Sequence, residues 1–467
     1  MNHPHLNPLP LRERKLKWQG KMAKKLEKVK YLIIGNSAGG IGAVEAIRGV
    51  DKTGTISIIS DEPYPVYSRP LISPYLAKER PMDNILYRPA DFYEKNNVQT
   101  LLDVKVEKLD LDKRAVELAG NHRVEWEKLL LATGGIPIFP RTEGSDLKGV
   151  FTFTTLDDAK AIDRFLSKSP KSSKKKVKAV VIGGGLIGVS VTEALVKRKV
   201  EVTVVEMRER ILNVILDEAA SALGAEALRK AGVKIIAGHT VTKITGDEAG
   251  NVASATLDDG KQLTCEMVIV AIGVQPRTEL VKDTAIKINR GIVVDRHMAT
   301  SSPDVYACGD VAEAYDFVLG VNRLTPIWPN AYVGGRVAGL NMAGVPTEYP
   351  GGTAMNSSHY FGVSVVSAGI TTKPDASYEE LSNKSDHSYK KVLLKDGLVV
   401  GMVFSGDIEK SGIVYNLMKD KVKVETFKNA LVADDFGLLS LPEEMWRSRL
   451  ELPPKPEAIV VQRSGGH

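Results

Sequence analysis

The sequence of 467 residues predicts an α/β protein with several domains, and three observations carry this prediction. Short apolar runs of the kind that form parallel strands buried on both faces recur along the chain. Two of these runs break into a glycine-rich turn that is followed by a helical pattern. At about 150 residues per domain, the length accommodates roughly three domains.

The composition excludes several classes of protein. Hydrophobic residues make up 43% and charged residues 26% of the chain, which excludes wholesale disorder. No long apolar run lacks both glycine clusters and charges, so we expect no membrane span. Cys265 and Cys308 are too few for a disulfide framework or a four-cysteine zinc site, and no metal site is expected. This cysteine usage favours a reducing cytoplasm.

The positive charge of the chain is concentrated at its N-terminus. The formal net charge is +6, and residues 1–30 contain nine Lys or Arg against two Glu, so the remainder is close to neutral. A basic tail on a near-neutral body does not indicate a nucleic-acid surface. Residues 1–27 are therefore expected to be a disordered basic extension without a secretory signal, and Met22 is an alternative start.

One strand–turn–helix pattern occurs twice in the chain. The runs Lys30–Gly40 and Lys178–Gly188 each pass from an apolar strand through a glycine turn into a helix, expected at 43–48 and 191–196. In each copy a second β-rich run follows and ends in an acid, Asp61 or Glu206. These acids lie 26 and 23 residues after the first glycine, close to the offset of about 20 for an acid that binds a ribose hydroxyl.

The glycines of this pattern have a physical purpose. The first permits a tight turn, the second lets a pyrophosphate approach the backbone, and the third lets helix and strand pack closely. A phosphate then lies at the helix N-terminus, where unpaired N–H groups and the helix dipole favour negative charge. The second copy has all three glycines, whereas the first has Ser37 in the middle position. The sequence therefore predicts two Rossmann-like dinucleotide-binding domains.

Later motifs extend this pattern into a resemblance to a known family. Apolar runs end in small residues at Leu129–Gly134 and Val268–Gly273, and Thr300–Asp310 closes with Gly-Asp. In this order the motifs resemble the pyridine nucleotide–disulfide oxidoreductase superfamily over about residues 29–445. The nearest members are rubredoxin and ferredoxin reductases, NADH oxidases and the flavin module of NADH-nitrite reductase.

The resemblance implies FAD in the first unit and NADH in the second, with NADPH as the alternative. Asp61, in preference to Glu62, would hold the adenosine ribose, the backbone of Val106 the adenine, and Asp310 the ribityl chain. The implied FAD-binding residues are Gly35, Ser37, Ala38, Gly40, Asp61, Glu62, Arg69, Pro70, Val106, Ala132, Thr133, Gly134, Gly309 and Asp310. The implied NAD-binding residues are Gly183, Gly185, Leu186, Ile187, Gly188, Glu206 and Gly273.

The resemblance also implies the order of domains. The FAD domain would be split into residues 28–148 and 279–349, with the NAD(P)H domain inserted at 149–278. A C-terminal α+β interface domain would occupy residues 350–445, and a tail 446–467. Lys168–Lys176 is expected to be a solvated loop, and Lys395-Asp-Gly predicts a hairpin turn in the interface domain.

The family pattern breaks near the expected reactive edge of the flavin. The stretch after Asp61 contains no cysteine, and both cysteines are expected to be packing residues, which disfavours thiol–disulfide chemistry. Reductases that serve small iron–sulfur proteins often carry Lys where this chain has Pro74, and many relatives carry Glu where it has Ser190. We therefore expect few charged groups at that edge. His359 is expected to be structural, and the alternative is that it faces the cofactor.

With these departures, the resemblance still implies hydride transfer. The protein would promote it mainly by holding the nicotinamide C4 about 3–3.5 Å from flavin N5. Trp328, Pro329 and Asn330 fit a helix start near the flavin, whose dipole would stabilise negative charge. Alternatively, Trp328 and Tyr332 only cover the flavin edge. No residue is assigned as catalytic with certainty.

We therefore expect an FAD-dependent NAD(P)H:acceptor oxidoreductase that delivers electrons to an iron–sulfur partner, a rubredoxin- or ferredoxin-like protein or a partner subunit. The chain itself would be a homodimer or a subunit of a larger redox complex. One alternative is an NADH oxidase that reduces oxygen directly. An alternative of another class is a non-catalytic, flavin-stabilised, redox-responsive interaction protein.

Overall fold

The computed structural model describes residues 27–120, 122–140, 142–168 and 176–450. The chain forms two compact units, which divide between Val363 and Ser364, and each is described by itself. Residues 1–26 of the predicted basic extension, most of the loop predicted at Lys168–Lys176 and most of the predicted tail lie outside the described residues. Within the described ranges, no helix combines the length and the apolar character that a membrane crossing requires.

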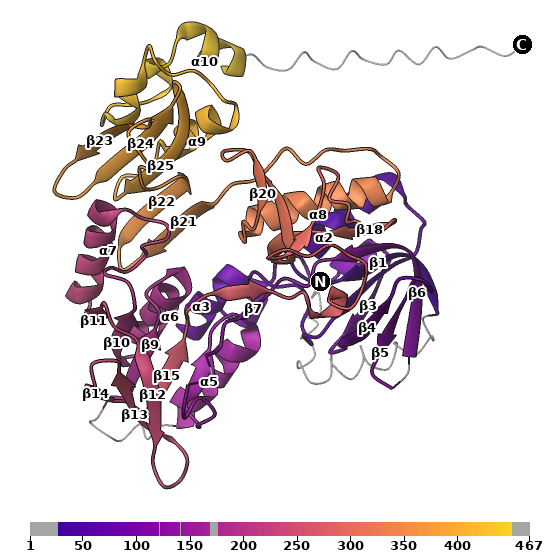
Figure 1. Ribbon diagram of the computed structural model, residues 1–467, viewed down its shortest axis with the longest axis horizontal. Coiled ribbons are helices and arrows are strands. Elements are labelled where there is room, and N and C mark those ends of the chain that lie inside the picture. Colours follow the sequence, from indigo (N-terminus) through magenta and orange to yellow (C-terminus); the bar gives the residue numbers. More distant parts are fainter. Residues whose placement is uncertain (1–26, 121, 141, 169–175, 451–467) are drawn as a thin grey trace, which may run out of the picture. The chain divides into compact units, whose positions relative to one another are not determined.

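A seven-stranded sheet contains the first glycine unit (Figure 1). Its order is β3-β2-β1-β6-β5-β4, and β18 pairs with β6. β1 lies parallel to β2 and β6, and its apolar run is buried, as the sequence predicts for a central strand. The strands are β1 Lys28–Ile34, β2 Ile56–Ser60, β3 Val98–Leu102, β4 Val106–Asp110, β5 Ala115–Leu118, β6 His122–Leu131 and β18 Val305–Ala307.

Two glycine-rich helices pack closely beside this sheet, α2 (Ala38–Val50) and α8 (Trp328–Met342) (Figure 1). A Cβ added at Gly335 would lie 2.0 Å from the carbonyl oxygen of Gly39, and one added at Gly339 would lie 2.6 Å from that of Ala43. The two helix backbones are therefore in direct contact. This contact places the start of α8 near the start of α2.

A five-stranded parallel sheet contains the second glycine unit, in the order β11-β10-β9-β15-β8. The succession β9, α6, β10 repeats β1, α2, β2 of the first unit, which confirms the two Rossmann-type sheets. The elements are β8 Val150–Thr152, α5 Leu156–Lys168, β9 Lys178–Ile182, α6 Leu186–Lys197, β10 Glu201–Glu206, α7 Glu218–Lys230, β11 Lys234–Ala237 and β15 Met267–Val270.

Smaller elements complete the first unit. The sheet β12-β13-β14 consists of Val241–Gly246, Val252–Leu257 and Gln262–Thr264, and the pair β7–β16 of Gly135–Pro137 and Val274–Pro276. The sheet β17-β19-β20 consists of Ile292–Val293, Ala312–Asp316 and Val321–Arg323. The short helices are η1 Arg69–Leu71, α3 Ile72–Leu76, η2 Met82–Ile85, α4 Phe92–Lys95, η3 Glu279–Val281 and η4 Gly309–Val311, and the strand β21 is Met355–Tyr360.

The second unit is built on an antiparallel sheet. Its strands run in the order β22-β25-β24-β23, at Val363–Gly369, Leu398–Ser405, Tyr389–Lys395 and Glu379–Lys384. The predicted hairpin turn joins β24 to β25, with Asp396 at φ +52° and Gly397 at φ +74°. The helices of this unit are α9 Ser411–Lys419, η5 Lys428–Val432, η6 Leu438–Ser440 and α10 Glu443–Leu450.

Candidate functional site

A cavity of about 880 Å³ lies at the carboxyl ends of β1, β2 and β6, where ligands of parallel α/β sheets bind. It is lined by residues from both glycine units. The predicted residues in its lining are Gly35, Ser37, Ala38, Asp61, Glu62, Arg69, Pro70, Ala132, Thr133, Gly134, Leu186, Ile187, Gly309, Asp310, Trp328 and Pro329. The predicted residues outside its lining are Gly40, Val106, Gly183, Gly185, Gly188, Glu206, Gly273 and Asn330.

The first glycine turn is a backbone cradle that side chains would fill. Gly35 has φ +121°, and a Cβ added there would lie 2.0 Å from the carbonyl oxygen of Ala132. A Cβ on Gly40 would lie 2.2 Å from the carbonyl oxygen of Gly35, so Gly40 serves helix–strand packing rather than the cavity lining. Ser37 precedes α2 in an extended conformation. The turn thus presents a helix N-terminus to the cavity, as the diphosphate of a dinucleotide requires.

The second glycine turn has the same geometry. Gly183 has φ +106°, and a Cβ on Gly188 would lie 1.9 Å from its carbonyl oxygen. A Cβ on Gly185 would meet no atom within 4 Å, so the turn faces open space. Glu206, 9% exposed, accepts hydrogen bonds from the N–H groups of Gly184 (2.6 Å) and Arg208 (2.9 Å). Its carboxylate is therefore fixed beside the turn.

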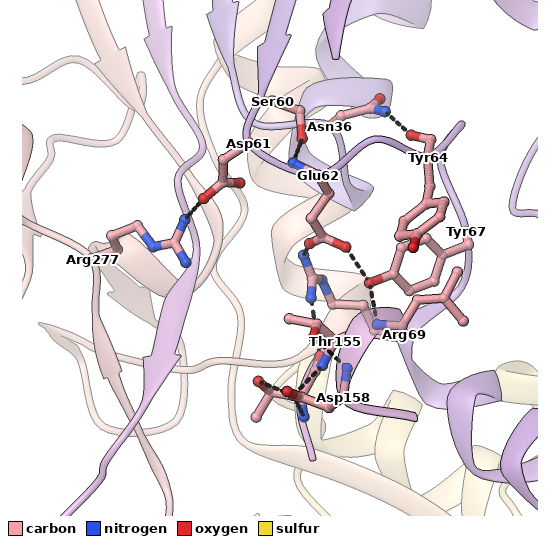
Figure 2. A network of polar contacts seen from close by, with 12 residues as sticks. Asn36, Ser60, Asp61, Glu62, Tyr64, Tyr67, Arg69, Thr155, Asp158 and Arg277 are labelled. Atoms are coloured by element: carbon pink, nitrogen blue, oxygen red, sulfur yellow. Dashed lines mark hydrogen bonds and ion pairs between the residues drawn. The ribbon is translucent and has the colours of Figure 1, made fainter. Parts of the chain in front are cut away.

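Glu62 is held by side chains of its own loop, which in turn bind the segment that leads into α5 (Figure 2). It forms an ion pair with Arg69 and accepts a hydrogen bond of 2.6 Å from the hydroxyl of Tyr67. Arg69 in turn donates to the carbonyl oxygen of Thr154 (3.0 Å), and the Tyr67 hydroxyl accepts from the N–H of Leu156 (3.0 Å). The network joins the loop after β2 to the start of α5.

Asp61 has a partner that the sequence did not reveal. Its Oδ2 accepts a hydrogen bond of 2.6 Å from Nη1 of Arg277, which also lines the cavity (Figure 2). Arg277 follows β16, and no motif marks it. Its backbone N–H donates to Gly134 and its carbonyl oxygen accepts from the Thr133 hydroxyl, both at 2.9 Å.

Asp310 lies in η4, after the positive φ of Gly309 (+77°). It is half-buried and lines the cavity. Burial raises the pKa of its carboxyl above the ordinary value, and the positive charge of Arg69 opposes that rise. A half-buried carboxyl at the wall of the cavity is placed to accept a hydrogen bond from a ligand hydroxyl.

Charged groups line the cavity beyond the two positions that the family spacing marks. Pro74 and Ser190 do line the cavity, but one face of α6 continues past Ser190 to Glu193 and Lys197, which line it too. Lys197 Nζ lies 2.8 Å from a carboxylate oxygen of Glu79 and 3.3 Å from one of Glu193. These charges come from positions that the family spacing does not mark.

Neither cysteine is placed for redox chemistry. Cys308 contributes to the cavity wall, but its side chain is 0% exposed and packs against Gly39. Cys265 is 1% exposed and lies in the apolar core that includes residues of strands β9, β10 and β15 of the second glycine unit. Burial raises the pKa of each thiol to about 12, so both are protonated at neutral pH.

α8 begins at Trp328, which confirms the predicted helix start; Ile327 is its N-cap, and Trp328 and Pro329 line the cavity. Asn330 instead donates to the carbonyl oxygens of Thr325 (3.3 Å) and Thr353 (3.1 Å), so it holds two loops together. His359 lines the cavity. Lining residues that the sequence did not predict include Asn36, Gly39, Ser60, Ile72, Glu79, Phe153, Thr154, Thr155, Glu193, Lys197, Val274, Arg277, Pro326, Ile327, Ala331, 355–358 and Tyr360.

Comparisons with known proteins agree with this geometry. Residues 29–335 match the family described as pyridine nucleotide-disulphide oxidoreductase, and residues 355–422 match the rubredoxin NAD+ reductase C-terminal domain. The chain is 31% identical over 433 residues to the NADH-dependent phenylglyoxylate dehydrogenase subunit epsilon of Aromatoleum evansii, covering 91% of this chain and 100% of that one.

A second relative and a solved structure complete the comparison. The NADH-rubredoxin oxidoreductase of Clostridium acetobutylicum is 30% identical over 383 residues, which is 82% of this chain and 92% of that one. The NAD-dependent persulfide reductase of A. fulgidus superposes with a TM-score of 0.80 at 26% identity, covering 87% of this chain and 80% of that one. The chain therefore belongs to the pyridine nucleotide-disulphide oxidoreductase family and is an NAD(P)H-dependent flavin oxidoreductase.

Proposed function

We propose that this protein passes electrons from NADH through FAD to an iron–sulfur partner, either a rubredoxin- or ferredoxin-like protein or a partner subunit. The observation that carries the proposal is the shared cavity. The cavity brings together the glycine turn after β1 and one face of α6. The described part of its lining offers no ionised thiol. FAD suits this role because it accepts a hydride and can release electrons singly.

The residues of the first glycine unit fit FAD. The turn at Gly35–Ala38 and the N-terminus of α2 would bind the diphosphate. Asp61 would accept from the adenosine ribose, the backbone of Val106 would hold the adenine, and Asp310 would accept from the ribityl chain. The N-terminus of α8 would stabilise negative charge on the flavin ring, with Trp328 over the ring edge.

We propose the domain boundaries that the family resemblance implies. The FAD domain would comprise residues 28–148 and 279–349, and the NAD(P)H domain 149–278. In the latter, the turn at Gly183–Gly188 would bind the NADH diphosphate, and Leu186 and Ile187, which line the cavity, would direct the nicotinamide toward the flavin. Gly273, at φ +122°, would allow close passage of the nucleotide.

NADH is the proposed hydride donor. The carboxylate of Glu206 is fixed by two backbone N–H groups, and each of its oxygens retains a lone pair for a ribose hydroxyl. A 2′-phosphate at the same place would meet a like charge. The competing influence comes from Arg208 and Arg210, two cations that lie two and four residues further along the chain and would favour NADPH.

The C-terminal part of the chain and the names of two relatives support an iron–sulfur acceptor. Residues 355–422 match the C-terminal domain of rubredoxin reductases, and one relative carries the name of a rubredoxin oxidoreductase. Another is named as a subunit of a dehydrogenase, which supports a place within a larger redox complex; a homodimer is the other assembly that we propose. Two buried thiols fit a reducing cytoplasm.

The experiment compares acceptors with the purified protein. NADH oxidation is measured without oxygen in the presence of rubredoxin, of a [2Fe–2S] ferredoxin or of neither, and then in air without either protein. We expect turnover to depend on an iron–sulfur protein. Rapid turnover in air that no partner accelerates would instead identify an NADH oxidase. Failure of NADH to reduce the bound flavin within seconds would favour the non-catalytic interaction protein.

A further inference from the structure

We propose that the ion pair between Arg277 and Asp61 spans the FAD crevice, and that the guanidinium of Arg277 supplies positive charge that retains the FAD diphosphate. The sequence motifs assign no role to Arg277. This inference rests on the FAD site proposed above and does not depend on the electron acceptor.

The strand order shows that the ion pair spans the crevice. β1 lies between β2 and β6, so the turn at Gly35, which follows β1, lies between the loops that follow the two outer strands. Asp61 directly follows β2, whereas Thr133 and Gly134 follow β6. Because neighbouring strands are about 4.8 Å apart, these outer loops are separated by roughly 10 Å.

The backbone of Arg277 is fixed on the β6 side of the crevice. Its N–H donates to Gly134 and its carbonyl oxygen accepts from Thr133, both at 2.9 Å. Its side chain then reaches Asp61 on the β2 side, with 2.6 Å between Nη1 and Oδ2 (Figure 2). The ion pair therefore crosses the edge of the sheet at which the glycine turn presents the N-terminus of α2.

Charge explains why a cation is needed there. A dinucleotide brings two negative phosphate charges to the turn, and Asp61 adds a third close by. The other Lys and Arg side chains of the described lining are engaged elsewhere, Arg69 with Glu62 and Lys197 with Glu79 and Glu193. Arg277 has five N–H donors, and among the described residues its guanidinium forms one hydrogen bond, from Nη1 to Asp61.

The ion pair between Arg277 and Asp61 is partly exposed, so it adds little to the free energy of unfolding. The side chains of Arg277 and Asp61 are 36% and 45% exposed, and ion pairs this exposed contribute little to folding. A hydrogen bond from a guanidinium to a phosphate is stronger, because both groups are charged. The pair should therefore act on FAD retention much more than on the folding of the protein.

The test measures how fast the purified holoprotein releases FAD. Arg277→Ala, Arg277→Lys and wild type are diluted into buffer at low and at high salt, and the rise of flavin fluorescence gives the dissociation rate. For Arg277→Ala we expect release about tenfold faster at low salt, the scale of one charge-assisted hydrogen bond. Arg277→Lys should lie between Ala and wild type, because it keeps the charge and loses the planar fork.

Arg114→Ala is the matched control. Arg114 is 45% exposed, forms an ion pair with Asp304 and lies outside the cavity lining, so its removal should leave FAD release unchanged. The proposed role of Arg277 is overturned if a folded Arg277→Ala protein releases FAD at the wild-type rate, or no faster than Arg114→Ala. If Arg277→Ala does not fold, Arg277→Gln, which removes the charge but keeps a long polar side chain, replaces it, and wild-type release from a folded Arg277→Gln overturns the proposal. Wild-type protein that purifies without FAD would instead refute the FAD site itself.

Discussion

At the scale of single residues, Asp310 tests the placement of the flavin. Its half-buried carboxyl would accept a charge-assisted hydrogen bond from the ribityl chain, worth about 1.5–3 kcal/mol. Asp310→Ala should therefore lower FAD occupancy, measured as the ratio of flavin to protein absorbance after purification. Asp310→Asn, which keeps an acceptor oxygen, should lose less. Full occupancy and unchanged FAD affinity in Asp310→Ala would refute this assignment.

Glu206 tests the choice of nucleotide. Its fixed, buried carboxylate should favour NADH, because the 2′-phosphate of NADPH would approach a negative charge. Wild type should therefore show the higher kcat/KM with NADH, and Glu206→Ala should narrow that difference, chiefly through KM. The measurement is kcat/KM for each nucleotide with an artificial one-electron dye. A wild type that prefers NADPH tenfold would contradict the prediction.

The cysteines test the absence of thiol chemistry. Both thiols are buried, and burial raises the pKa of each to about 12. Cys265→Ala/Cys308→Ala should therefore keep reduction of FAD by NADH near the wild-type rate in stopped-flow absorbance, although the lost packing lowers stability. Near-complete loss of reduction in a folded, FAD-loaded double variant would show that a thiol takes part.

Single residues also mark the limit of prediction from the sequence. The glycine turns, Asp61 and Asp310 were found because each belongs to a local motif. Arg277 was missed, since 216 positions separate it from Asp61 and only the fold brings the two together. Glu193 and Lys197 were missed for another reason: the spacing marks Ser190, and only the course of α6 along the cavity adds the next two turns.

At the scale of elements, the strands were predicted more closely than the helices. β1, β2, β9 and β10 lie where apolar runs and their terminal acids placed them. α2 and α6 begin five residues before the predicted starts at 43 and 191, because glycines and small residues look like loop in the sequence. In α2 those glycines are helical, and Gly39 is needed for the contact with α8.

The α2–α8 contact gives a prediction about stability. A Cβ on Gly335 would lie 2.0 Å from a backbone oxygen, so Gly335→Ala must separate the helices and should lower the free energy of unfolding by about 1–3 kcal/mol. Gly49, also helical, is the control, because a Cβ there meets nothing within 4 Å. Gly49→Ala should leave stability unchanged or raise it by up to about 1 kcal/mol. Equal effects in urea unfolding would contradict this packing argument.

At the scale of the whole molecule, the repeat in the sequence accounts for the architecture of the first unit. Two copies of one strand–turn–helix unit form the parallel strands at the centres of two sheets, and residues from both copies line one cavity. The domain boundaries stay a prediction. The acceptor is the least predictable feature, because it depends on a surface that meets another molecule, and no motif within one chain encodes that surface.

The most direct test of the central claim is a stopped-flow experiment without oxygen, in two mixing steps. Bleaching of the flavin absorbance near 450 nm should follow mixing with NADH, on the time scale of turnover at about 1–1,000 s⁻¹. Mixing the reduced protein with oxidised rubredoxin or ferredoxin should then restore the flavin band as the iron–sulfur protein is reduced. A flavin that NADH reduces but that neither iron–sulfur protein reoxidises, while air does so rapidly, would contradict the account.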